Sequence, residues 1–371
     1  MNCSTFIITK EWHDTSYQYE PDLIRMVMER DLCGTTLPII QSPMAGVQDS
    51  SLAIAVSEAG GLGSLPCGML SIEKIISEIE SIKSATDKPF NLNFFCHEMP
   101  KYNPARQAMW QETLKPYFTK AGTLCASQSS AASRLPFNHD IADAIEPFSP
   151  PVISFHFGLP DKDLLARIKR WGTRVISTAT TVDEAIWLES QGVDAVIAQG
   201  IEAGGHRGMF LSETLSDQLG LFSLVPQIVA KINIPVIAAG GIASSEGVKA
   251  AMMLGAEYVQ VGTAYLLCTE AKTSPIHRMA LKGERSNLTA VTNIFSGRPA
   301  RGIVNRAMAE LGYLREDAPE FPYASVEMTQ LRTLYEKQGV GDFSPLWSGQ
   351  NTSGCKEVSA KELTQLLAQN F

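Results

Sequence analysis

Residues 152–158 read Val-Ile-Ser-Phe-His-Phe-Gly, an apolar run with one histidine near its end and a glycine that closes it. Such a run is typical of a buried β-strand. Because side chains alternate along a strand, Ser154 and His156 share one face and Phe155 and Phe157 share the other. We expect the two phenylalanines to pack beneath covering helices and His156 to face a pocket at the strand end. The alternative is a core histidine that bonds a backbone carbonyl.

Seven further apolar runs share this character, and helical patterns separate most of them. The eight predicted strands are residues 37–42, 62–65, 90–95, 152–158, 174–177, 195–200, 234–241 and 258–263. Strands that alternate with helices pair in parallel through right-handed crossovers. Eight such units predict an α/β fold, a (β/α)8 TIM barrel over residues 37–270. A doubly wound sheet is the alternative, but the turn at residues 43–46, Pro-Met-Ala-Gly, is not the dinucleotide fingerprint expected there.

Three stretches fall outside this rhythm. Residues 1–36 form an N-terminal extension with a helical pattern at 22–30. Residues 96–150 form an insertion after the third strand, with an amphipathic helix at 107–117, and insertions of this kind often carry specificity. Residues 271–371 are expected to be a C-terminal helical segment that packs on the barrel mouth.

Composition excludes several classes of function. The formal net charge is −8 and no cluster of lysines and arginines occurs, so we expect no nucleic-acid partner. The seven cysteines show no zinc or redox spacing, and they predict reduced thiols in a cytoplasmic protein. No apolar run is long enough to cross a bilayer, and no pair of histidines has metal-ligand spacing. We therefore expect neither a membrane nor a metal partner.

Glycines gather where the last three predicted strands end. They are Gly204 and Gly205 after the sixth strand, Gly240 and Gly241 after the seventh, and Gly262, next to Thr263, after the eighth. In barrels these loops commonly hold a phosphate with free backbone N–H groups, and glycine lets the backbone approach the oxygens. Each pair could instead be only a tight turn, but the ordered set favours phosphate binding. No lysine stands at the Walker position, so a nucleoside triphosphate is not indicated.

Two amide side chains lie at other strand ends. Asn93 ends the third strand and Gln199 ends the sixth. An amide offers a donor and an acceptor, which suits the carbonyl and nitrogen edge of a flavin, and Ala45 and Gly46 are small enough for the backbone to approach a flat ring. The alternative for each amide is a hydrogen bond that satisfies a loop. His206, in the glycine loop, is expected at the surface or on the phosphate side, well behind His156 as a catalyst.

Together, these motifs resemble the nitronate monooxygenase family, formerly called 2-nitropropane dioxygenases, over residues 37–305 and weakly to residue 350. The matching stretches are residues 43–46 with 59–63, 91–95, 154–158, 199–208, 239–242 and 260–263. As a set these motifs are specific. The branch with the Ser-Phe-His-Phe-Gly motif at residues 154–158 is the one that this chain resembles.

The resemblance implies a barrel that binds FMN non-covalently, with its phosphate near Gly241 and Gly262-Thr263, and His156 as the catalytic residue. The residues expected at the cofactor are Met44, Ala45, Gly46, Asn93, Gln199, Gly204, Gly205, Gly240, Gly241, Gln260, Gly262 and Thr263. The implied reaction oxidises an alkyl nitronate, such as the toxic propionate 3-nitronate, with O2 to a carbonyl compound and nitrite. The chain could form a homodimer.

One segment departs from the family pattern. Relatives often carry Tyr-Pro-x-x-Asn-x-Leu-Thr before the C-terminal helix, whereas residues 321–329 here read Phe-Pro-Tyr-Ala-Ser-Val-Glu-Met-Thr. This departure bears on substrate preference and leaves the flavin site intact. Two other functions stay open: an FMN-dependent NAD(P)H reductase of a quinone or enoyl thioester, and a non-catalytic binder of flavin or phosphate.

Overall fold

The computed structural model describes residues 32–126 and 134–369. The helical pattern at residues 22–30 lies outside these residues. Within them, eight parallel strands form a barrel in the order β1-β9-β8-β6-β5-β4-β3-β2. The ring closes between β1 and β2, where the Leu62 N–H donates to the Ile39 carbonyl at 2.8 Å. The prediction of a (β/α)8 barrel is confirmed.

All eight strands lie where the apolar runs predict them. They are β1 (Ile39–Gln41), β2 (Gly63–Pro66), β3 (Phe90–Phe95), β4 (Val152–His156), β5 (Arg174–Ala179), β6 (Ala195–Gln199), β8 (Val236–Ala239) and β9 (Tyr258–Val261). Parallel pairing aligns their carboxyl ends, as the pairing of Phe95 with His156 illustrates. The residues that follow the strands therefore meet at one face of the barrel.

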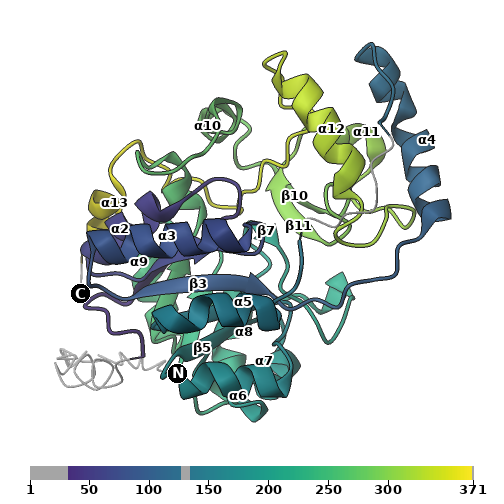
Figure 1. Ribbon diagram of the computed structural model, residues 1–371. Helices are drawn as coiled ribbons and strands as arrows, with labels where there is room; N and C mark the ends of the chain where they lie inside the picture. The colour runs from purple at the N-terminus through teal and green to yellow at the C-terminus, as the bar shows by residue number, and fades with distance from the viewer. Residues whose placement is uncertain (1–31, 127–133, 370–371) are drawn as a thin grey trace, which may run out of the picture. The chain divides into compact units, whose positions relative to one another are not determined.

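Eight helices surround the strands in the described part of the chain (Figure 1). They are α2 (Ser50–Glu58), α3 (Ile72–Ala85), α5 (His139–Ile145), α6 (Lys162–Arg170), α7 (Val182–Ser190), α8 (Leu221–Val229), α9 (Ser245–Met253) and α13 (Ala360–Leu367). Four of them begin at a capping residue, with Asp49, Ser71, Thr181 and Ser244 each accepting a backbone N–H bond from the first turn. Asp161 stands at the corresponding position before α6 but makes no such bond.

Apolar side chains pack on both faces of the barrel strands. Phe155 packs outside the strands, with its ring centroid 5.4 Å from that of Phe137, and Ile40 and Leu62 pack inside. Part of the interior is polar, because the Asn91 amide donates to the hydroxyls of Ser64 and Ser154 at 3.0 and 2.9 Å. This polar group joins β2, β3 and β4, and Ser154 precedes His156 by two residues on the same strand.

The segments outside the barrel differ from their predictions in two respects. The predicted insertion at 96–150 contains α5, which packs between α3 and α6 as a barrel helix, so the chain leaves the barrel over a shorter stretch. The segment from 271 onward is not only helical and does not lie only at the mouth, because it supplies two strands and its last helix, α13, packs on α2 and α9 (Figure 1). The remaining elements are α4 (Pro104–Lys120), α10 (Pro275–Lys282), α11 (Arg306–Leu311), α12 (Ser325–Glu336), β7 (Gly205–His206), β10 (Thr289–Thr292) and β11 (Ala300–Ile303). The strands β10, β11 and β7 form a separate antiparallel sheet.

The insertion and the C-terminal part share a hydrophobic core of their own, here called the second core. Its buried side chains are Trp110, Leu114, Phe118, Ile294, Phe295, Ala307, Met308, Leu311, Ala318, Met328, Leu331, Tyr335 and Phe343. The first three come from α4, which lies beside α12 in Figure 1. Two segments far apart in the chain therefore fold together, because each presents an apolar face that the barrel leaves uncovered.

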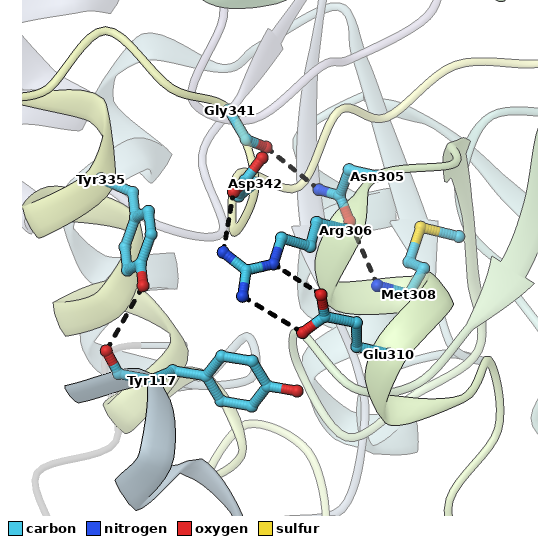
Figure 2. A network of polar contacts seen from close by, with 8 residues as sticks. All are labelled: Tyr117, Asn305, Arg306, Met308, Glu310, Tyr335, Gly341 and Asp342. Carbon is cyan, nitrogen blue, oxygen red and sulfur yellow. Dashed lines mark hydrogen bonds and ion pairs between the residues drawn. The ribbon is translucent and has the colours of Figure 1, made fainter. Parts of the chain in front are cut away.

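Polar contacts surround the second core. Figure 2 shows Arg306 between Glu310 and Asp342, at 2.7 and 3.3 Å, and the Tyr335 hydroxyl donating to the Tyr117 carbonyl at 3.3 Å. The ion pairs are partly exposed, and such pairs stabilise proteins by at most about 1 kcal/mol. Burial of the large apolar side chains therefore provides most of the stability of this part.

Replacing Trp110 with alanine should destabilise the second core by about 3–5 kcal/mol, the usual cost of emptying a buried aromatic site. Trp110 is 0% exposed, whereas Met109, its neighbour on the same helix, is 58% exposed and provides the matched control. Urea unfolding followed by near-ultraviolet circular dichroism measures both variants. Equal unfolding midpoints for Trp110→Ala and Met109→Ala would contradict a packed core at this place.

Candidate functional site

A cavity of about 250 Å³ opens at the carboxyl ends of the barrel strands. This is the end of the fold where TIM barrels place their active sites. All of the predicted site residues line the cavity: Met44, Ala45, Gly46, Asn93, His156, Gln199, Gly204, Gly205, Gly240, Gly241, Gln260, Gly262 and Thr263. The fold thus brings together residues from six different strand ends.

His156 ends β4 and has both ring nitrogens in contact with neighbours. Nε2 lies 3.2 Å from the His206 carbonyl oxygen, and Nδ1 lies 3.2 Å from the Thr178 hydroxyl. A carbonyl only accepts, so Nε2 carries the hydrogen and Nδ1 has the lone pair. Burial, together with the smaller effect of the charges of Arg207 and Arg298, lowers the pKa of His156 to about 4, although the bond to the His206 carbonyl opposes this shift. The imidazole is therefore a neutral base at neutral pH.

The prediction for Phe157 is wrong. Its φ is 68°, a left-handed conformation that is uncommon for a residue with a bulky side chain. The strand alternation ends at His156, and the Phe157 ring turns toward the mouth, with its centroid 4.5 Å from that of His156 and 5.6 Å from that of Phe321. Backbone conformations of this kind gather at functional sites, where the surrounding structure holds them.

Two more histidines, His97 and His206, join this aromatic cluster. His97 is buried, with its ring centroid 4.7 Å from that of Phe321, and burial lowers its pKa to about 4. His206 is neither a surface nor a phosphate-side residue, because it lines the cavity and its Nε2 lies 2.8 Å from the Ser296 hydroxyl. Burial and then the charge of Arg134 lower the pKa of His206 well below its usual value. All three imidazoles are neutral at pH 7.

Several residues that line the cavity could not be identified from the sequence patterns. Arg134 comes from the insertion, and His277, Arg332 and Trp347 come from the C-terminal part. None stands at the end of a barrel strand, so strand patterns do not identify them. Phe321, whose ring contacts three residues of the aromatic cluster, lies in the segment that departs from the family pattern.

The glycine loops form a cradle at the other end of the cavity. Gly241 has φ 71°, and a Cβ at Gly204 would lie 2.5 Å from the Gly349 nitrogen, so neither position accepts a side chain without strain. Within residues 32–126 and 134–369, the backbone N–H groups of Gly241, Ile242 and Thr263 have no hydrogen-bond acceptor. Unpaired N–H groups close together favour an anion with several oxygens, such as a phosphate.

The side-chain amides in the cavity differ in whether their nitrogen and oxygen atoms already form hydrogen bonds within the protein. Both ends of the Gln199 amide are used within the protein, because Nε2 donates to the His206 carbonyl at 3.0 Å and Oε1 accepts from the Gly208 N–H at 2.9 Å. Gln199 therefore holds the loop that carries His206. The Asn93 amide donates to Ser154. By contrast, the buried Gln260 Oε1 has no partner in the described part of the chain, so it can accept a bond from a ligand.

Residues 32–126 and 134–369 contain no group of three or more His, Cys, Asp or Glu side chains that could hold a metal ion. None of their helices is long and apolar enough to span a membrane.

Known proteins resemble this chain over almost its whole length. The family described as nitronate monooxygenase matches residues 27–370. A nitronate monooxygenase from Pseudomonas aeruginosa is 40% identical, over 92% of this chain and 97% of that protein. The solved structure of nitroalkane oxidase from Streptomyces ansochromogenes is 36% identical, with a TM-score of 0.82 over 91% of this chain and 96% of its own. FabK from Thermotoga maritima is 27% identical, with a TM-score of 0.68 over 91% and 94%.

The match with the family, the identity of its curated relatives and the shared barrel lead to one conclusion. The chain is an oxidoreductase that belongs to the nitronate monooxygenase family.

Proposed function

We propose that the protein oxidises alkyl nitronates, such as propionate 3-nitronate, with O2 to a carbonyl compound and nitrite, using non-covalently bound FMN. The observation that supports this most strongly is a neutral histidine, His156, in the same cavity as a glycine cradle with unpaired N–H groups. One end of the cavity suits a phosphate and the other suits proton transfer. That combination fits a flavin site better than it fits a simple phosphate site.

The residues present fit FMN. The N–H groups of Gly241, Ile242 and Thr263 would hold its phosphate, and the unpartnered Oε1 of Gln260 would accept a bond from the ring system. Met44, Ala45 and Gly46 line the same cavity, and the small Ala45 and Gly46 would let a flat ring approach the backbone. When bound, FMN supplies the redox chemistry, taking electrons from the substrate and passing them to O2.

His156 would move the proton that a neutral nitroalkane must lose before it becomes a nitronate. Nδ1 carries the lone pair and would accept that proton, and the Thr178 hydroxyl, 3.2 Å away, would turn to accept the new N–H. The His206 carbonyl holds Nε2–H and fixes the ring. A nitronate that is already ionised needs no base, so for this form the imidazole would only position the anion.

Proton transfer from a neutral nitroalkane to His156 should continue at acidic pH. The base must be neutral, and burial lowers the pKa of His156 to about 4 from the usual 6.5. The kcat/KM for a neutral nitroalkane should therefore stay level from pH 7.5 to about pH 5 and fall only as the pH approaches 4. A rate profile over this range measures it. A fall centred near pH 6.5 would show a histidine with an ordinary pKa and would contradict the buried neutral state.

The function is tested by oxygen uptake of the purified, FMN-loaded protein with propionate 3-nitronate and, separately, with NADH and a quinone or enoyl thioester. We expect uptake and nitrite release with the nitronate. The NAD(P)H-dependent reductase that the sequence leaves open is the second candidate. Consumption of NADH with no nitrite from nitronate would favour that reductase, and inactivity with both would favour a non-catalytic binder.

A cytoplasmic location is part of the proposal. Cys67, Cys96, Cys125, Cys268 and Cys355 carry free thiols, and burial raises the pKa of each thiol. Such thiols are typical of proteins in a reducing compartment.

A further inference from the structure

One segment of the C-terminal part contacts the loop after β6 at four places. It comprises residues 296–301, Ser-Gly-Arg-Pro-Ala-Arg, and is here called the arginine segment. Its polar contacts with the loop join Arg301 Nε to the Ile201 carbonyl at 2.9 Å, Ser296 Oγ to His206 Nε2 at 2.8 Å, the Pro299 carbonyl to the Arg207 N–H at 2.8 Å, and Arg298 Nη1 to the Met209 carbonyl at 3.3 Å. The partners are between 89 and 100 positions apart in the chain. The arginine segment therefore holds the loop over residues 201–209.

This loop matters to the proposed base through one atom, the His206 carbonyl oxygen. That oxygen lies 3.2 Å from His156 Nε2, and the Thr178 hydroxyl lies 3.2 Å from His156 Nδ1. A hydroxyl can donate or accept, so Thr178 can bond either neutral tautomer of the imidazole. A carbonyl only accepts, so it bonds the one tautomer whose hydrogen is on Nε2. The position of the His206 carbonyl therefore decides that the lone pair of His156 lies on Nδ1.

The residue that follows His156 also needs support. Phe157 has φ 68°, and a phenylalanine keeps this left-handed conformation only where its surroundings hold it. The guanidinium of Arg298 lies over the Phe157 ring, with Cζ 4.4 Å from the ring centre. The other cation–ring contacts in the described part of the chain span 5.7 to 5.9 Å. A cation this close to an aromatic face is attracted to it, so Arg298 stabilises the turned position of Phe157.

Arg298 thus contacts both structures that hold His156. Its Nη1 bonds the loop three residues beyond His206, and its guanidinium face covers the ring of the residue after His156. The neighbouring arginines contact the loop in a different way. Arg301 donates to the Ile201 carbonyl and to Thr289, and Arg207 donates to the carbonyls of residues 199 and 200. Those bonds hold the loop against the rest of the protein, whereas Arg298 ties the loop to the His156 strand end.

We propose that Arg298 is a positioning residue for His156: it holds Phe157 and the loop of the His206 carbonyl together, so that the imidazole keeps its hydrogen on Nε2 and its lone pair on Nδ1. Arg298 is not among the residues that line the cavity, so it acts through these neighbours and not on the substrate. The inference rests on the proposed function for the role of His156 as a base. The tautomer itself is a property of the protein and can be measured separately.

Nitrogen NMR of the FMN-loaded protein, labelled with 15N-histidine, measures the tautomer without any substrate. Protonated and unprotonated ring nitrogens give separate signals, and the His156→Asn variant identifies those of His156. In the wild type we expect the hydrogen on Nε2 alone. In Arg298→Met, which keeps the length of the side chain but loses its charge and donors, we expect a mixture of the two tautomers. An unchanged Nε2–H signal in Arg298→Met would overturn the proposal.

Kinetics measure the consequence for the reaction. Arg298→Met should lower kcat/KM for nitroethane about 10- to 30-fold, mainly through kcat, because a misplaced lone pair takes the carbon proton poorly. The value for ethyl nitronate, which needs no base, should change less than about threefold. Arg298→Lys should restore part of the loss, because an ammonium can still lie over the ring and donate to the Met209 carbonyl. Arg285→Met, at an exposed arginine between α10 and β10, should leave both substrates unaffected.

The remaining outcomes separate this role from a structural one. Equal losses with both substrates, or a loss of FMN from Arg298→Met, would assign Arg298 to the fold and overturn the proposal. If Arg298→Met does not fold, Arg298→Gln, which keeps a donor for the Met209 carbonyl but no charge for the ring, takes its place with the same expected change. If the wild type oxidises neither substrate, the proposed function fails, and the tautomer measurement still tests Arg298.

Discussion

Replacing His156 with asparagine should reduce the oxidation of a neutral nitroalkane by roughly 100-fold or more, the usual scale for losing a general base. The same variant should retain FMN and part of its turnover of the corresponding nitronate. Asparagine keeps a donor of similar reach but has no lone pair that can take the carbon proton. The measurement compares nitroethane with ethyl nitronate, each assayed by initial oxygen uptake. His139, an exposed histidine at the start of α5, provides the matched control variant His139→Asn.

A structural role for His156 gives a different pattern. Its ring bonds Thr178 and the His206 carbonyl, so a mere packing defect would lower FMN content and both activities together. Near-wild-type rates with both forms of the substrate would remove His156 from the mechanism. A loss of oxygen uptake with nitroethane that is much larger than the loss with ethyl nitronate therefore distinguishes a catalytic role of His156 from a structural one.

Replacing Gly241 with valine should abolish FMN retention and leave a folded barrel. Gly241 has φ 71°, which valine rarely adopts, and its N–H is one of the three unpaired groups at the proposed phosphate position. A branched side chain there would shift the backbone and keep phosphate oxygens away. The measurement is the flavin to protein absorbance ratio of the purified variant, together with its far-ultraviolet circular dichroism.

The control for this variant places valine at another glycine with a positive φ, away from the cavity. Gly192, between α7 and β6, has φ 83° and open space around its Cβ position, and it is not among the cavity residues. Gly192→Val should bind FMN as the wild type does. Wild-type FMN occupancy in Gly241→Val would show that the phosphate lies elsewhere.

The barrel could be predicted because the sequence patterns that specify its strands and helices are local. Several of the apolar runs are followed by a helix with its own start signal, such as the capping bonds of Asp49 and Thr181, and eight repeats leave few ways to pair the strands. The site residues at strand ends were predictable for the same reason. Since parallel strands end at one face, His156 and the glycines of the later loops had to meet there.

The remaining parts depend on distant contacts. Phe157 breaks the strand alternation because its ring packs on Phe95 and Phe321, and neither contact can be inferred from the local pattern. Arg134 reaches the cavity from the insertion, and α13 completes the helical ring from the end of the described chain. Gln199 appeared free for a ligand because its bonds to residues 206–208 depend on how the loop folds back.

The second core also determines which parts of the protein can fold early during translation and which must fold late. The Gln107 amide on α4 donates to the Glu327 carboxylate on α12, across 220 residues of sequence. When a ribosome has completed β6, Trp110, Leu114 and Phe118 have been made but their partners on α11 and α12 have not. The growing chain must therefore carry an uncovered apolar helix while most of the barrel is translated. Contacts this distant in sequence close late, so the substrate mouth can be completed only near the end of translation.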